Sequence, residues 1–179
     1  YLNNLGTGLR DRYAQTGTLS DLEEAIRVSR AALKLTPPNS PDRPSRLNNL
    51  GSRLRNRYAH TGTLSDLKKA RKIYEEALQD RSDSEAPLVM RMILRGLGDV
   101  YSLLKRWQDA RQTYQKGAGI AEVLYRNTYL PGGKEQESAQ STGLYTGWVR
   151  ACLHLGAADP LTAREALVAS EAGRARAFL

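Results

Sequence analysis

A five-residue string, Leu-Asn-Asn-Leu-Gly, occurs at residues 2–6 and again, letter for letter, at residues 47–51. The similarity continues at a constant offset of 45, so that the seven residues 16–22 are identical to residues 61–67. Self-similarity at a period of roughly 20 to 50 residues indicates stacked units, because one such unit cannot bury its apolar face alone. The repeat therefore constrains the fold more than any other feature of the sequence.

Each repeat contains two segments in which apolar residues recur at the spacing of a helix. In the first segment of repeat one, Leu2, Leu5 and Leu9 fall on one face. A turn at Gly17 follows, and the second segment ends in the proline-rich stretch 36–44, because proline cannot continue a helix. The alternating pattern of a β-strand is absent from the sequence. The predicted fold class is all-α.

The second helix of each repeat has a predicted start signal. Ser20 is placed to cap this helix in repeat one, and Glu23, three residues on, would complete a capping box. Ser65 is the corresponding cap in repeat two. Further along, Asp159 followed by Pro160 predicts another helix start, since proline is favoured at the first helical position.

The later part of the chain continues the pattern with less similarity. Residues 88–126 carry Leu97-Gly98, Tyr101, Ala110 and Tyr114 at the spacing of the tetratricopeptide pattern, Leu-Gly-x-x-Tyr followed by a small residue and an aromatic one. A more divergent helix pair follows. We predict three repeats, residues 1–44, 45–87 and 88–126, and a fourth helix pair over residues 127–179.

The repeats resemble tetratricopeptide repeats of the long type. Leu-Asn-Asn-Leu, preceded by Pro-Asp-Arg-Pro-Ser-Arg, is similar to the kinesin light chain repeats. The fuller string, with Arg-Tyr-Ala-x-Thr-Gly-Thr-Leu-Ser-Asp-Leu, resembles the tandem repeats that precede CHAT-type caspase-like cysteine peptidases, and residues 171–179 resemble the last helix before such a peptidase. The resemblance implies a right-handed superhelix of about four antiparallel helix pairs. It also implies a longer protein, whose peptidase residues would lie beyond Leu179.

Kinesin light chains and other tetratricopeptide proteins hold an extended peptide or a helix in a concave groove lined by the first helix of each pair. The resemblance therefore implies a protein or peptide ligand, or a neighbouring domain of the same polypeptide, as the partner. Matched position by position, the implied groove residues are Asn3, Asn4, Thr7 and Arg10 in the first repeat, Asn48, Asn49, Ser52, Arg55 and Asn56 in the second repeat, and Arg91, Arg95 and Asp99 in the third repeat.

The spacing of these residues agrees with a surface separate from the core. Asn3 and Arg10 are seven residues apart and share a face different from that of Leu5. An amide offers both a donor and an acceptor to the main chain of a peptide, and an arginine can pair with a carboxylate through two bonds. The same asparagines could instead cap or bridge neighbouring helices, and the sequence leaves both interpretations open.

The net charge of +8 is unevenly distributed. Residues 91–134 carry eight basic residues and three acidic ones. A basic stripe can bind nucleic acid, so a nucleic-acid-binding helical repeat that uses Arg91, Arg95 and Arg106 is the alternative function. A solvated helix surface would explain the same charges.

Other features argue against an enzyme, a cofactor or a membrane segment. The single cysteine, Cys152, excludes an internal disulfide and a cysteine-based zinc site, and it fits a reducing, cytoplasmic location. Cys152 and His154 would point about 200° apart on a helix, so they cannot form a nucleophile–base pair. The sequence has no phosphate-loop motif and no metal-ligand spacing. Its apolar runs are shorter than the roughly 18 residues that a bilayer span requires.

Overall fold

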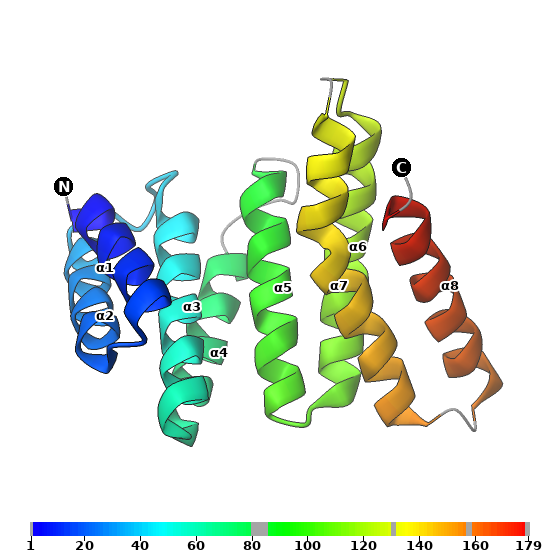
Figure 1. Cartoon of the computed structure of the whole chain (residues 1–179), viewed down its shortest axis with the longest axis horizontal. Coiled ribbons are helices and arrows are strands. Elements are labelled where there is room, and N and C mark those ends of the chain that lie inside the picture. The colour runs from blue at the N-terminus through cyan, green and yellow to red at the C-terminus, as the bar shows by residue number, and fades with distance from the viewer. Residues whose placement is uncertain (1, 80–85, 130–131, 157–158, 178–179) are drawn as a thin grey trace. The chain divides into compact units, whose positions relative to one another are not determined.

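The computed structural model describes residues 2–79, 86–129, 132–156 and 159–177. Over these residues the chain forms eight α-helices and no β-strand (Figure 1). The helices are α1 (Leu2–Thr16), α2 (Leu19–Lys34), α3 (Arg43–Thr61), α4 (Leu64–Gln79), α5 (Pro87–Leu103), α6 (Trp107–Arg126), α7 (Gly133–Leu155) and α8 (Pro160–Ala177). The prediction of an all-α fold with about four helix pairs is confirmed. None of the described helices combines the length and the apolar character needed to cross a membrane.

The helices group into two compact units, residues 1–81 and 82–179. In the first unit α1 packs on α2, α2 on α3, and α3 on α4. In the second unit α5 packs on α6, α6 on α7 and α7 on α8, and α5 also contacts α7. Within each unit, every helix thus contacts its neighbours in the chain, which is the arrangement that stacked helix pairs require. The finer boundaries at residues 44, 87 and 126 stay predictions.

A glycine on the first helix of a pair receives an aromatic ring from the second helix. A Cβ atom at Gly51 of α3 would lie 2.7 Å from the buried ring of Tyr74 in α4. In the second unit a Cβ atom at Gly98 of α5 would lie 2.6 Å from the ring of Tyr114 in α6. Both distances are shorter than carbon–carbon contact. The glycine therefore allows the two antiparallel helices to approach.

The helix starts follow the predictions only in part. The carboxylate of Asp159 accepts hydrogen bonds from the backbone N–H groups of Leu161 (3.3 Å) and Thr162 (3.1 Å), so the predicted cap of α8 is confirmed. The predictions for Ser20 and Ser65 are wrong, because these serines lie inside α2 and α4, each of which begins one residue earlier. A serine within the helix no longer has the extended backbone of a cap.

Arginine–aspartate pairs join the two helices of each repeat in the first unit. Arg57 of α3 donates from Nε (2.7 Å) and Nη2 (2.6 Å) to the two carboxylate oxygens of Asp66 in α4. The equivalent residues of repeat one, Arg12 and Asp21, form the same two-bond pair. Asp66 is only 1% exposed, so its charge depends on this partner. The arginine and the aspartate stand at the same spacing in both repeats because they form this ion pair between the two helices. The sequence patterns did not identify the pair.

Replacing Asp66 by Asn is expected to lower the free energy of unfolding of the first unit by about 2 kcal/mol, since two charge-assisted hydrogen bonds are lost. The hydrogen bonds from Arg57, and then its charge, hold the pKa of Asp66 below its ordinary value, while burial opposes this shift. The stabilisation is therefore complete above the ordinary pKa of about 3.9 and disappears as the pH falls through the lower folded pKa.

Thermal unfolding followed by circular dichroism between pH 7 and pH 2 tests this expectation. The variant should lose stability at neutral pH and show a weaker dependence on acid. Glu24→Gln is the matched control, because its pair with Arg27 is exposed and should contribute little. Equal melting temperatures for Asp66→Asn and the unmodified protein at pH 7 would contradict the stabilising role of the Arg57–Asp66 pair.

Candidate partner-binding surface

The predicted groove residues of the first unit belong to α1 and α3. Those whose side chains are described and at least partly exposed are Thr7, Arg10, Asn49, Ser52, Arg55 and Asn56. We call this set the first-helix face. Arg10 donates from Nε (3.0 Å) and Nη2 (2.6 Å) to one oxygen of Asp11, in an exposed pair. The side chains of Asn3 and Asn4 lie outside the described residues, although their backbone belongs to α1.

Two predicted groove residues lie in the interior instead. Asn48 is only 7% exposed. Arg91 of α5 is 4% exposed, and its guanidinium donates to the carboxylate of Glu137 and, at 2.5 Å, to Oε1 of Gln140, both in α7. The prediction that Arg91 lines an open surface is therefore wrong. Helical spacing placed it near the groove, but α7 covers it.

The two remaining candidates of the second unit lie at the contacts of α5. Arg95 is exposed, and a Cβ atom at Gly143 of α7 would come within 2.8 Å of its Nε. Asp99 accepts a hydrogen bond of 2.7 Å from the hydroxyl of Tyr114. Burial, and then the negative charge of Asp99, raise the pKa of this tyrosine. The carboxylate of Asp99 is thus satisfied from inside the unit.

A buried arginine that the sequence patterns did not single out lies near Arg10 of the first-helix face. Arg53 of α3 is 3% exposed, and its Nε has no hydrogen-bond partner among the described residues. Its Nη2 would lie 3.2 Å from a Cβ atom at Gly6 of α1. Burial, and then the nearby charge of Arg10, lower the pKa of Arg53. The available signal was a mismatch between the repeats, because Gly8 stands in repeat one where Arg53 stands in repeat two.

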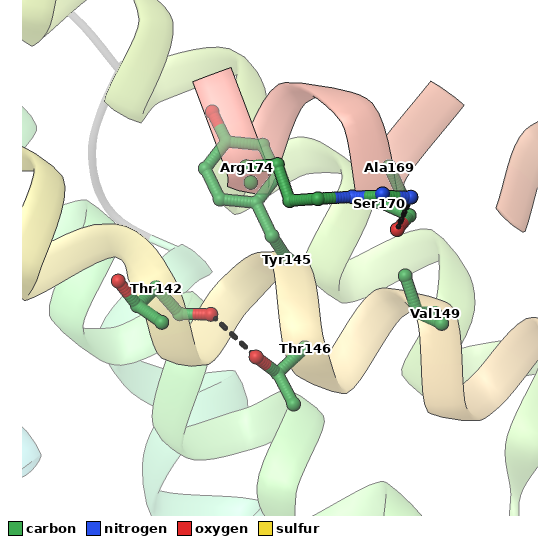
Figure 2. A pocket seen from close by; sticks show the side chains of 8 residues that line it. Thr142, Tyr145, Thr146, Val149, Ala169, Ser170 and Arg174 are labelled. Atoms are coloured by element: carbon green, nitrogen blue, oxygen red, sulfur yellow. Dashed lines mark hydrogen bonds between the residues drawn. The ribbon is translucent and has the colours of Figure 1, made fainter. Parts of the chain in front are cut away.

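A cleft of about 340 Å³ lies between α7 and α8 in the second unit (Figure 2). Thr142, Tyr145 and Val149 of α7 and Ala169, Ser170 and Arg174 of α8 line it. Nη2 of Arg174 donates to the hydroxyl of Ser170 at 3.2 Å, across the upper part of the view in Figure 2. Sequence analysis did not identify this cleft, since none of its residues belongs to the repeated strings.

The cysteine and histidine of α7 do not form a reactive pair. Cys152 is buried, and burial is the main cause that raises the pKa of its thiol to about 11. The ring of His154 stacks on Trp107 at 3.8 Å between centroids. Within the described ranges, no three His, Cys, Asp or Glu side chains gather in an arrangement that could hold a metal ion.

Both repeats of the first unit resemble a known protein family. Residues 1–42 and 45–83 each match a family model described as Tetratricopeptide repeat. No curated protein matches the chain. The two matched segments cover α1 to α4, with the paired antiparallel helices and the contact of Gly51 with Tyr74 described above. The first unit of this all-helical protein is therefore similar to two tetratricopeptide repeats.

Proposed function

We propose that this protein binds a peptide or a protein partner, or a neighbouring domain of the same polypeptide, on the first-helix face. Tetratricopeptide repeats mediate protein–protein interactions, and the match to that family covers this unit. The observation that carries the proposal is the row of half-exposed polar side chains at Asn49, Ser52 and Asn56 of α3. Their spacing puts them on one side of the helix, where the leucines that pack against α4 are absent.

The chemistry of this row suits the main chain of a partner. Asn49 and Asn56 each offer two amide donors and one carbonyl acceptor, and Ser52 adds a hydroxyl. Backbone groups of an extended peptide present alternating donors and acceptors whatever its sequence. Such a surface would bind the partner's backbone, while charged neighbours would select among sequences.

Replacing Asn49 and Asn56 together by Ala is expected to weaken binding of the partner roughly tenfold or more, since two or more hydrogen bonds are lost. A partner captured with the protein would be identified by mass spectrometry, purified, and titrated calorimetrically against both forms. Lys68→Ala with Lys72→Ala on α4 is the matched control, because both lysines are exposed on the second helix. Unchanged affinity of the asparagine variant, with its circular dichroism intact, would refute the proposed surface.

We further propose that the repeats are the sensor or regulatory part of a larger cytoplasmic protein with a CHAT-like peptidase downstream. The support is the resemblance of the repeat string and of residues 171–179 to the region that precedes such peptidases. Reading the gene beyond the codon of Leu179 tests this directly. An unrelated domain in that position would contradict the regulatory role without affecting the binding surface.

The alternative, nucleic-acid binding through residues 91–134, has less support. Arg91 is buried against Glu137, and Nε of Arg106 donates to Asp109 at 2.7 Å. Nε of Arg111 lies 3.6 Å from a carboxylate oxygen of Glu165. Several of the charges that suggested a nucleic-acid surface are therefore engaged within the unit. A flat response in a gel-shift series at low salt would exclude this alternative.

A further inference from the structure

We propose that the first-helix face selects partners with an acidic residue, and that the guanidinium of Arg53 binds the partner's carboxylate. The inference rests on the proposed function and names the chemistry that the surface recognises. It starts from a comparison of the three repeats at equivalent positions. Gly6, Gly51 and Gly98 are equivalent in the repeats, as are the residues that follow them, Thr7, Ser52 and Asp99.

The side chain that fills the space beside this glycine is different in repeat one. Beside Gly51 and Gly98 it is a tyrosine ring, that of Tyr74 and that of Tyr114. The equivalent residue of repeat one is Ser29, which is too short to fill the space. Arg53 reaches in from α3 instead, and both its Nη2 and the hydroxyl of Ser29 lie within 4 Å of the position that a Gly6 Cβ would take. Arg53 thus takes the place of the aromatic ring.

The two side chains differ in what their polar ends meet. The hydroxyl of Tyr114 reaches the carboxylate of Asp99, the residue after the glycine. In repeat one that residue is Thr7, which carries no charge. No carboxylate of the described chain pairs with Arg53, and its buried Nε has no acceptor. A buried cation without a counter-charge is costly, so a carboxylate supplied from outside would be strongly favoured.

The geometry favours a peptide carboxylate over a nucleic-acid phosphate. Arg53 is 3% exposed, so only a small group at the end of a side chain or of a chain can reach it. A planar carboxylate pairs with a guanidinium through two parallel bonds. A nucleic acid instead needs a row of accessible cations along its backbone, whereas Arg10 beside Arg53 already pairs with Asp11.

The variant Thr7→Asp tests the inference, because it would supply from within the chain the carboxylate that Asp99 supplies in the second unit. We expect it to raise the melting temperature by several degrees. It should also weaken binding of a fluorescein-labelled hexaglutamate peptide at least tenfold. Thr7→Asn is the matched control, and it should change neither property. Fluorescence anisotropy at physiological salt measures binding, with hexaglutamine and single-stranded oligo-dT as the other probes.

Arg53→Gln provides an independent measurement. Removal of an unpaired buried charge should leave the melting temperature unchanged or higher, while hexaglutamate binding is lost. A purely structural arginine predicts the opposite, a lower melting temperature and unchanged binding. The inference is overturned by that result, by equal behaviour of Thr7→Asp and Thr7→Asn, or by binding of oligo-dT without binding of hexaglutamate.

The captured partner separates this inference from the proposed function. If Asn49→Ala with Asn56→Ala weakens binding of the partner but Arg53→Gln and Thr7→Asp do not, the first-helix face binds the partner and the proposed selectivity for acidic residues is wrong. If none of the variants weakens binding of the partner, the proposed function itself is wrong.

Discussion

Replacing Glu137 by Ala is expected to lower the free energy of unfolding of the second unit by about 3 to 5 kcal/mol, the usual cost of breaking a buried ion pair. Glu137 is 7% exposed, and its carboxylate faces the guanidinium of Arg91, which is itself 4% exposed. The substitution leaves Arg91 as a buried charge between α5 and α7. Among the described residues, the hydrogen bond to Gln140 would then be the one left to satisfy it.

Urea unfolding followed by tryptophan fluorescence measures this loss, since Trp107 and Trp148 both lie in the second unit. The control is the double variant Arg91→Met with Glu137→Leu, which removes both charges and keeps similar volumes. It should stay within about 1 kcal/mol of the unmodified protein, because apolar pairs often replace buried ion pairs without loss. A loss below about 1 kcal/mol for the single variant would mean that water reaches Arg91.

Gly98→Ala is the second substitution with a large expected effect. Its Cβ atom would lie 2.6 Å from the buried ring of Tyr114, so the ring or α5 must move. Overpacking of this kind costs about 1 to 3 kcal/mol, which outweighs the gain of up to about 1 kcal/mol from replacing glycine within a helix. The net result should be a less stable second unit.

A double-mutant cycle isolates the cause. In a Tyr114→Ala background, itself less stable by about 3 to 5 kcal/mol, Gly98→Ala should become stabilising because the obstructing ring is gone. Gly119→Ala in α6 is the control, since no described atom of a neighbouring element comes within 4 Å of its Cβ position. That substitution should stabilise the unit by about 0.5 to 1 kcal/mol. If Gly98→Ala behaves like Gly119→Ala, the close approach of α5 and α6 is wrong.

Spacing predicted which positions could belong to the candidate surface, but it did not predict which of them are accessible to a partner. The repeat predicted which positions of α3 carry polar side chains, and Asn49, Ser52 and Asn56 are partly exposed as a surface requires. It also predicted Asn48 and Arg91, which the neighbouring helices cover. Spacing gives the angle of a side chain around its own helix. It does not say which other helix packs at that angle.

The sequence by itself determined the helices and their pairing, because these depend on apolar residues three or four apart and on a repeat that recurs after 45. Only the tertiary structure decided what each charged side chain contacts. Arg57 meets Asp66 across a turn, Arg91 meets Glu137 across 46 residues, and Arg53 reaches Gly6 of the preceding repeat. A charged side chain in the interior is costly without a counter-charge, and packing between helices determines whether one is within reach.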